Sequence, residues 1–239
     1  MPLTAIYQGK SNPIWNFNES DRGKQFNCKY CGSNMILVLG NQVIHHFRHY
    51  DNTDGICSHV ETQEHLKMKM IVADIFREYG YDIEVEKIVK NDDGKINIID
   101  VLISKGKRRI AIECQYSNIS SWEVKERTRD LGDKKFFVLW LLDSESYNVH
   151  GYSRQLRGPE KFLHRINYGR CFYLWRTQKT IISVKFKRIQ KYNDFTGTSY
   201  YLKNTRKFAC KVPIGYKFTL GYTTDINSNK QYRMARIND

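Results

Sequence analysis

The sequence lacks the features that mark a membrane or secreted protein. None of its uncharged apolar runs approaches the ~20 residues that a membrane-spanning helix needs, and the longest, Phe136–Leu142, has the length of a strand. The first residues, MPLTAIYQGKSN, contain no apolar stretch of the kind found in signal peptides. We therefore expect a cytoplasmic protein without a membrane partner.

Cysteine is also scarce. The 239 residues include six cysteines, and without a secretion signal this number argues against a disulfide framework. Two of the six form the motif CKYC, from Cys28 to Cys31, and a CxxC motif in the cytosol indicates metal or redox chemistry. Aromatic residues make up 13% of the chain, a share too high for a chain that is disordered throughout.

Acidic residues are rare in the last third of the chain. Residues 151–239 hold 19 lysines and arginines against 4 acidic residues, a net charge of +15, whereas residues 1–150 hold 20 against 21, a net charge of −1. This basic region is also rich in aromatic residues, and such a surface neutralises phosphates and stacks on bases. We expect nucleic acid as the partner, DNA rather than RNA; a solvated basic surface, or attraction to an acidic protein or an anionic lipid, is the alternative. The predicted nucleic-acid contacts are Arg127, Arg165, Arg170, Lys185 and Lys187.

The chain divides into three predicted regions: residues 1–59, residues 60–148, and the basic, aromatic, β-rich residues 149–239. The middle region has the pattern helix, strand, strand, strand, helix, strand, so the predicted fold class is α/β. Within it, Ser120 and Glu123 form the pattern of a capping box. The predicted elements are a helix near Glu61–Tyr79, the strands Ile83–Val89, Ile96–Ile103 and Ile110–Gln115, a helix from Ser120 to about Leu131, and the strand Phe136–Leu142.

Potential zinc ligands follow the CxxC motif. The segment HHFRH contains three histidines, and Cys57 comes soon after it. Two thiolates two residues apart, followed by His and Cys within about 30 residues, can close a tetrahedral zinc site. A redox CxxC would precede a helix, and no helical pattern follows here. The predicted structural zinc ligands are Cys28 and Cys31 with two of His46, His49 and Cys57, of which His49 and Cys57 are favoured.

Two carboxylates and an amide interrupt the apolar strands of the middle region. Alternate residues of a strand share a face, so Glu113 and Gln115 should point the same way, and a hairpin should bring Asp100 of the preceding strand close to Glu113. Buried charges need a partner or a metal, and two oxygen ligands on rigid strands suit a hard cation such as Mg²⁺. The alternative is that these groups lie at strand ends and face solvent.

Seven segments occur in the order found in competence protein CoiA-like nucleases. They are CKYCG, HHFRH, ETQEHLKMK, AIECQYSNIS, WEVKERT, FFVLWLL and FLHRINYGRCFYLW, and the resemblance covers about residues 26–190. Asp100, followed by Glu113-x-Gln115, a helix and a buried strand, also resembles the PD-(D/E)xK nucleases. The resemblance implies a PD-(D/E)xK restriction-endonuclease-like core of order αβββαβ, with a small zinc-knuckle region at its N-terminal side.

The resemblance also implies roles for single residues. Asp100 and Glu113 would hold Mg²⁺ or Mn²⁺, and Gln115 would occupy the position of the usual lysine. Glutamine cannot supply a positive charge, so another cation would have to reach the site. The candidates for that cation are Lys67, Lys69 and Arg127. The helices would add Glu61, His65 and Lys69 from the first and Glu123 and Arg127 from the second, with an ordinary solvated helix face as the alternative for the first set.

The predicted function is that of a Mg²⁺-dependent nuclease that hydrolyses DNA phosphodiester bonds. In-line attack of water would cut the bond, and the basic C-terminal region would hold the DNA. The alternative is a catalytically inactive DNA-binding module that acts in DNA uptake, recombination or defence and has lost activity through its ExQ motif. A zinc-organised protein-interaction domain is a third interpretation. The oligomeric state is open, and a homodimer is one outcome because many nucleases of this fold dimerise.

Overall fold

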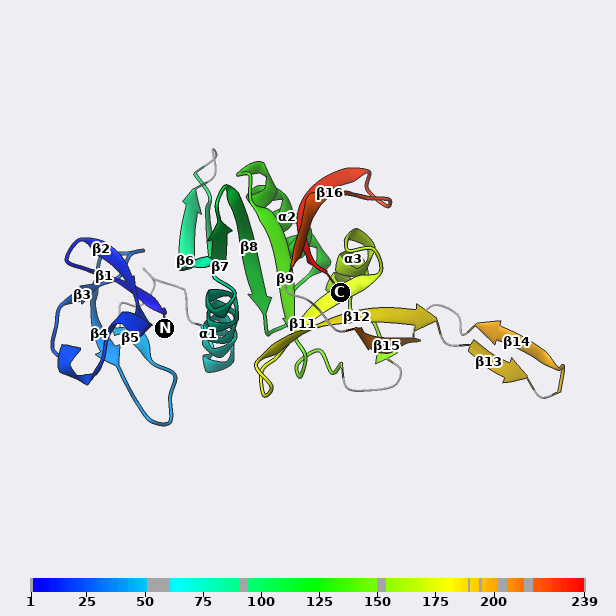
Figure 1. The fold of residues 1–239 in the computed structure, drawn as a ribbon, viewed down its shortest axis with the longest axis horizontal. Coiled ribbons are helices and arrows are strands. Elements are labelled where there is room, and N and C mark those ends of the chain that lie inside the picture. The colour runs from blue at the N-terminus through cyan, green and yellow to red at the C-terminus, as the bar shows by residue number, and fades with distance from the viewer. Residues whose placement is uncertain are drawn as a thin grey trace.

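The structure is a computed structural model that describes residues 2–50, 61–90, 94–149, 154–188, 190–193, 195–201, 206–212 and 217–238. Residues 154, 187–188, 190–191, 199–201 and 206–212 are described by their backbone alone. The described strands form three sheets, which follow one another along the longest axis of the molecule (Figure 1).

The N-terminal residues form an antiparallel sheet of order β2-β1-β3-β4-β5. Its strands are β1 (Thr4–Tyr7), β2 (Lys10–Pro13), β3 (Phe26–Asn27), β4 (Asn34–Val38) and β5 (His46–His49). Two short 3-10 helices, η1 (Ile14–Asn16) and η2 (Glu19–Asp21), connect β2 to β3. The sheet lies at one end of the molecule, beside the first α-helix (Figure 1).

The middle region follows the predicted order of elements. It consists of α1 (Gln63–Glu78), β6 (Asp82–Lys90), β7 (Ile96–Lys105), β8 (Arg108–Gln115), α2 (Ser121–Asp133) and β9 (Phe137–Asp143). β6, β7 and β8 pair antiparallel, and β9 then pairs parallel to β8. The prediction of a mixed α/β protein is therefore confirmed.

The C-terminal region extends the same sheet. Its elements are β10 (Arg154–Gln155), α3 (Gly158–Ile166), β11 (Arg170–Trp175), β12 (Thr180–Arg188), β13 (Gln190–Asn193), β14 (Thr198–Tyr201), β15 (Arg206–Val212), β16 (Phe218–Asp225) and β17 (Lys230–Ile237). The central sheet has the order β10-β15-β12-β11-β9-β8-β7-β6, and β17 pairs with β16 and β9. Strand pairing thus runs across the boundary predicted at residue 149, because β11 lies parallel to β9.

Local sequence signals fix the ends of the two central helices. Thr62 caps α1 by accepting a hydrogen bond from the backbone N–H of His65, and Gly80 follows the helix at φ +72°, a conformation that favours glycine. The predicted capping box is present at the start of α2, where Ser120 and Glu123 exchange side-chain and backbone hydrogen bonds.

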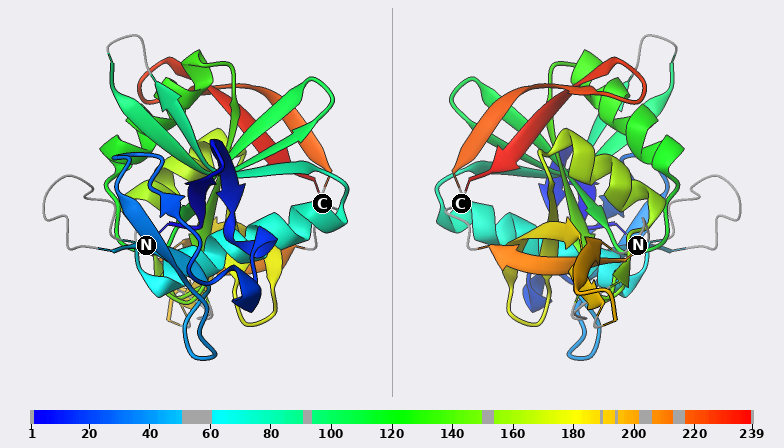
Figure 2. Two further views of the ribbon diagram at one scale, coloured as in Figure 1. Left: turned by 90° about the vertical axis from the view of Figure 1, so that its left-hand side faces the viewer. Right: turned by 90° about the vertical axis from the view of Figure 1, so that its right-hand side faces the viewer.

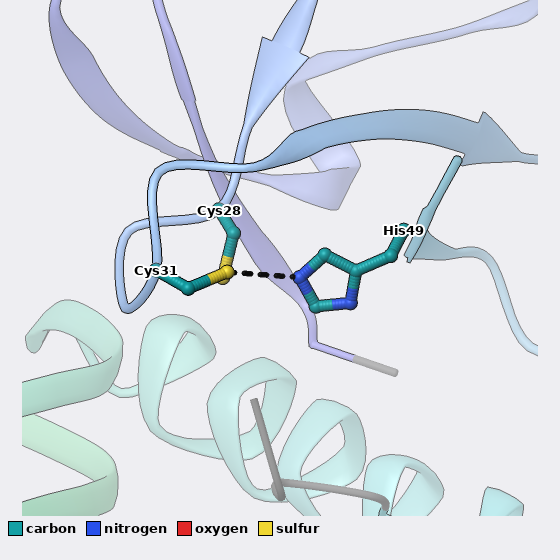
Figure 3. Close-up of side chains that lie close together, drawn as sticks. All are labelled: Cys28, Cys31 and His49. Carbon is teal, nitrogen blue, oxygen red and sulfur yellow. Dashed lines mark hydrogen bonds between the residues drawn. The ribbon is translucent and has the colours of Figure 1, made fainter. Parts of the chain in front are cut away.

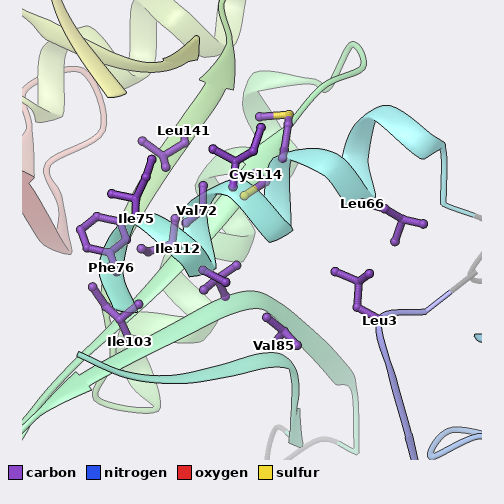
Figure 4. Packing of buried hydrophobic residues seen from close by; sticks show 14 of the residues in the cluster. Leu3, Leu66, Val72, Ile75, Phe76, Val85, Ile103, Ile112, Cys114 and Leu141 are labelled. Atoms are coloured by element: carbon purple, nitrogen blue, oxygen red, sulfur yellow. The ribbon is translucent and has the colours of Figure 1, made fainter. Parts of the chain in front are cut away.

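The central sheet is covered on both faces. Ile110, Ile112 and Cys114 pack with α1 in one apolar cluster, whereas Ala111 packs with residues of α2 and α3 in the other. This alternation along β8 is the predicted one, and Figure 2 shows the helices on the two sides of the sheet. The α1 cluster continues into the N-terminal sheet, and Figure 4 shows Leu3 next to Leu66 of α1.

Among the residues that the structure describes, no helix is both long enough and apolar enough to cross a membrane.

Candidate functional site

A cavity of about 450 Å³ opens at the side of β7 and β8, between α1 and α2. It collects most of the residues predicted to be catalytic. Glu61, His65, Asp100, Glu113 and Gln115 all line it, together with Arg127. The cavity therefore joins the loop before α1, the hairpin β7–β8 and helix α2 at one place.

The strand register brings the two central carboxylates together. Val101 of β7 pairs with Ile112 of β8, so continuing the register by one residue sets Asp100 opposite Glu113, as the hairpin predicted. Asp100 Oδ2 accepts a hydrogen bond from the backbone N–H of Cys114 at 2.8 Å. Both carboxylates are buried, with 6% of Asp100 and 1% of Glu113 exposed. The alternative in which they face solvent does not hold.

His65 connects Asp100 to Glu61. His65 Nε2 lies 3.3 Å from Asp100 Oδ2, and its Nδ1 lies 3.6 Å from Glu61 Oε1. Glu61 precedes α1 rather than lying on it, since Thr62 is the N-cap. The contact expected from a shared helical face nevertheless forms, because the residue before the cap still lies over the first turn.

Lys69 is buried beneath the cavity and does not line it. Its ammonium donates to Glu61 Oε2 and to Glu86 Oε1, the latter at 2.7 Å. Glu86 has φ +54°, a conformation that side chains rarely adopt. Its carboxylate accepts hydrogen bonds from the backbone N–H of Leu3 at 2.8 Å and from the hydroxyl of Thr4 at 2.7 Å. Lys69 therefore holds Glu61 in place and links it to the N-terminal sheet.

Glu113 is the least satisfied charged group of the site. Its Oε2 forms an ion pair with Arg127 Nε at 2.5 Å, while its Oε1 is buried without a hydrogen-bond partner among the described residues. Burial raises the pKa of Glu113 to about 8, and the nearby Asp100 adds to this against the opposing effect of Arg127. Arg127 is fixed by donating to the carbonyl oxygen of Ile98.

The pKa values of Asp100 and His65 are shifted in opposite directions. Burial opposes ionisation of Asp100, but His65, Lys69 and Arg127 outweigh it and lower the pKa of that carboxyl. Burial likewise opposes a charge on His65, and Asp100 and Glu61 raise its pKa above the ordinary value.

This arrangement suits a divalent cation. The side-chain donor atoms of Glu61, His65 and Asp100 all lie within 4.8 Å of one another. The unsatisfied Oε1 of Glu113 belongs to the same cavity. A cation would supply the positive charge that the buried Glu113 lacks, and carboxylate oxygens are the ligands that Mg²⁺ and Mn²⁺ prefer.

Gln115 carries no positive charge, and its amide takes part in a local hydrogen bond. The amide nitrogen donates to the carbonyl oxygen of Ser117 at 2.9 Å. Of the three alternative cations, Lys67 is exposed and Lys69 is buried between two carboxylates. Arg127 alone among these three lines the cavity.

A second cluster of potential metal ligands lies in the N-terminal sheet. The donor atoms of Cys28, Cys31 and His49 are within 4.8 Å of one another, and the His49 ring points at the two sulfurs (Figure 3). The turn between the two cysteines is closed by a hydrogen bond to sulfur and by a glycine. The backbone N–H of Tyr30 donates to Cys28 Sγ at 3.4 Å, and Gly32 has φ +74°.

The pKa of the Cys31 thiol lies below its ordinary value. Burial raises its pKa, but hydrogen bonds with Ser33, Cys28 and His49 lower it to about 6. His46, the other histidine considered, is buried and contacts the carbonyl oxygen of Ile44 through Nδ1 at 2.6 Å. The favoured fourth ligand, Cys57, lies outside the described residues.

The basic residues predicted to contact nucleic acid are dispersed. Arg165 forms an ion pair with the buried Asp225 at 2.9 Å. Arg170 and Lys185 stand opposite each other on β11 and β12, and the side chain of Lys187 lies outside the described part of the chain. Arg127 is at the cavity, about one helical turn from Glu123 in α2, whose carboxylate is used in the capping box.

Sequence reasoning missed two residues near the cavity. Glu86 alternates with Val85 and Lys87 in a regular strand pattern, and nothing in that pattern distinguishes it from the exposed Glu84. Tyr30 lines the cavity from the N-terminal sheet. Its position between the two cysteines was the one available signal, because residues inside a knuckle are held rigidly.

The fold and the site define a mixed α/β protein with a buried carboxylate cluster of nuclease-like type. The model of the family described as "Competence protein CoiA, nuclease-like domain" matches residues 61–210. The chain belongs to this family. The match begins at Glu61 and includes each residue named above for the carboxylate cluster.

No curated protein matches the chain. Among solved structures, the crystal structure of a protein of unknown function, AF1548, is 21% identical, with a TM-score of 0.29. The match covers 33% of this chain and 47% of that one, so the chain spans about half the length of that protein.

Proposed function

We propose that this protein is a divalent-metal-dependent nuclease that hydrolyses DNA phosphodiester bonds in a PD-(D/E)xK-type core. The observation that carries the proposal is Glu113, a carboxylate buried beside Asp100 with one oxygen that has no partner among the described residues. Family membership supports a nuclease-related role, and the net charge of +15 in residues 151–239 supports DNA as the partner.

Asp100, Glu113 and Glu61 would hold Mg²⁺ or Mn²⁺, with His65 as a further donor. When bound, such a cation lowers the pKa of water and stabilises the charge that develops on a phosphate. Asp100 is suited to this task because its pKa is lowered, so it is ionised before any ligand arrives. His65 lies within hydrogen-bond reach of Asp100 and can carry a proton at Nε2.

Arg127 takes the place that the ExK lysine has in related sites. Its guanidinium lies at the cavity, pairs with Glu113 and is held by the Ile98 carbonyl. A guanidinium can bind phosphate through two parallel hydrogen bonds. Gln115 has its amide nitrogen directed to Ser117 and holds the end of β8.

The experiment that tests this function is cleavage of labelled DNA by the full chain with Mg²⁺ and without added Mg²⁺ or Mn²⁺. Products that form only with the metal support the nuclease. DNA that is bound but never cut, under any metal condition, would instead support the non-catalytic binding module.

Cys28, Cys31 and His49 are proposed as ligands of a structural zinc ion. Two thiolates and an imidazole at this spacing are three of the four donors of a structural zinc site, and Cys57, outside the described residues, is the favoured fourth. We expect Cys28→Ala to reduce bound zinc from about one ion per chain to near zero and to lower the melting temperature, since structural zinc contributes directly to folding. Zinc content measured by mass spectrometry, beside Cys171→Ala as a buried cysteine remote from the cluster, checks this. A Cys28→Ala protein that keeps its zinc would contradict the assignment.

A further inference from the structure

One wall of the cavity comes from outside the family match, which begins at residue 61. Pro2, Tyr30 and His49 of the N-terminal sheet line the cavity together with the carboxylates. Tyr30 is the residue immediately before Cys31 in the motif CKYC. The loop that gathers the potential zinc ligands thus also presents an aromatic ring to the nuclease-like site.

This wall is fixed to the core by hydrogen bonds and apolar contacts. The backbone N–H groups of Leu3 and Thr4 donate to the buried carboxylate of Glu86 at 2.8 and 3.2 Å. Lys29, the other residue between the cysteines, donates to the backbone carbonyl of Glu86. Leu3 is fully buried and belongs to the same apolar cluster as Leu66 of α1. The N-terminal sheet and the core are therefore packed as one body around the cavity.

Tyr30 lies close to the acidic end of the site. Lys29 Nζ lies 5.3 Å from the centroid of its ring. The carboxylates of Glu86 and Glu61 interact electrostatically with its phenol. The remaining lining includes further apolar or aromatic side chains, namely Ile96, Ile98, Tyr116 and Ile119. Such a surface suits a nucleobase better than it suits a chain of phosphates alone.

The size of the cavity limits what can reach the carboxylates. About 450 Å³ is in the range of pockets that bind one small molecule, and the two central carboxylates are almost completely buried at its base. A phosphodiester must enter the cavity to contact them. A duplex exposes its phosphates but keeps its bases paired and stacked, so a strand whose phosphate is at the carboxylates could bring the neighbouring base to Tyr30 only by leaving its partner.

We propose that the N-terminal sheet makes this a site for single-stranded DNA, in which Tyr30 stacks on a base next to the phosphate at the carboxylates. The inference deepens the proposed nuclease function and rests on the same cavity. Tyr30 is the specificity-determining residue. It stacks on a base of the bound strand, and it belongs to the wall that excludes a base-paired strand. Duplex DNA would be processed only where an end, a flap or a gap exposes a single strand.

The test is equilibrium binding without added Mg²⁺ or Mn²⁺, where nothing is cut and the proposed structural zinc is kept. Fluorescence anisotropy is measured with a labelled single strand and with the same strand in a blunt duplex. We expect Tyr30→Ala to weaken single-strand binding about tenfold, the effect of losing one stacked base, and to leave duplex binding within about twofold. Tyr30→Phe, which keeps the ring, should bind the single strand nearly as the wild type does.

Tyr79→Ala is the matched control, since Tyr79 is an exposed tyrosine at the far end of α1. It should change neither affinity. Circular dichroism and zinc content establish that each variant is folded. The proposal is overturned if Tyr30→Ala leaves single-strand binding unchanged, or weakens single-strand and duplex binding equally. If the Tyr30 effect is present but no substrate is ever cut in Mg²⁺, the nuclease function fails while the single-strand site stands.

Discussion

Glu113→Gln is expected to reduce Mg²⁺-dependent DNA cleavage at least about 100-fold, the scale on which removing one preorganised electrostatic group acts. Glutamine has the shape of glutamate and can still contact Arg127, but it carries no negative charge for a cation. DNA binding without added Mg²⁺ or Mn²⁺ should stay within about twofold of the wild type, because Glu113 is 1% exposed and would act on the phosphate through a bound cation. Gel assays of labelled DNA and anisotropy measure the two quantities.

The same substitution should not destabilise the metal-free protein. Burial raises the pKa of Glu113 from 4.5 to about 8, so the folded state holds this proton more tightly than the unfolded chain does. Its contribution to stability is present below about pH 4.5 and is lost as the pH rises through about 8. Glu113→Gln has no such proton to lose, so its stability does not fall in this pH range. Urea unfolding without added Mg²⁺ or Mn²⁺ at pH 8.5 should therefore find the variant at least as stable as the wild type.

Glu84→Gln is the control for Glu113→Gln. Glu84 lies on β6 with 52% of its side chain exposed and pairs with Lys87. Its replacement should alter neither cleavage nor stability by more than a small amount. A Glu113→Gln protein that is folded and cuts DNA at the wild-type rate would remove Glu113 from the site.

Lys69→Met is expected to cost about 3–5 kcal/mol of stability, the loss typical of removing one partner from a buried ion pair. The Lys69 side chain is 0% exposed and neutralises both Glu61 and Glu86. Methionine fills a similar volume but removes the nearest cation from both carboxylates, which leaves Glu86 with Lys29 at 4.0 Å and Glu61 with His65 at 3.6 Å. Urea denaturation gives the free energy of unfolding, and a fall of 3 kcal/mol or more is a large fraction of a domain's stability.

Two variants separate this effect from a general property of the helix. Lys67→Met, two residues away on the exposed side of α1, should change stability by less than about 0.5 kcal/mol. Adding Glu86→Gln to Lys69→Met should recover part of the loss, since one unpaired charge is then removed. If the double variant is as unstable as the sum of the two single variants, the two residues are not energetically coupled as the structure indicates.

Much of the fold could be predicted from the sequence because it follows local rules. The alternation of IAIECQ assigns Ile110 and Glu113 to opposite faces of β8, and burial on both faces confirms it. The Ser120–Glu123 capping box and Gly80 fix helix ends within a few residues. The helix α3 was not predicted within the β-rich region, although Pro159 at its first turn is a helix-start signal.

The site was predictable only in part. Asp100, Glu113 and His65 meet because a hairpin and the preceding helix have few ways to pack, so proximity follows from topology. The contact of Leu3 with Glu86 joins residues 83 positions apart, and no periodic pattern encodes such a pairing. Lys69 therefore looked like a candidate catalytic cation in the sequence, whereas in the structure it is bound between Glu61 and Glu86 and acts as a positioning residue.

The central claim is that the buried carboxylates act with a divalent cation to cut DNA. The most direct test uses the wild-type chain, dialysed into buffer without Mg²⁺ or Mn²⁺, with labelled single-stranded, blunt and flapped DNA. We expect no product without these metals and shortened strands when Mg²⁺ or Mn²⁺ is restored, with the single strand cut fastest. Intact DNA of every form in both metals, from protein that still binds it, would show that the carboxylates do not cut DNA.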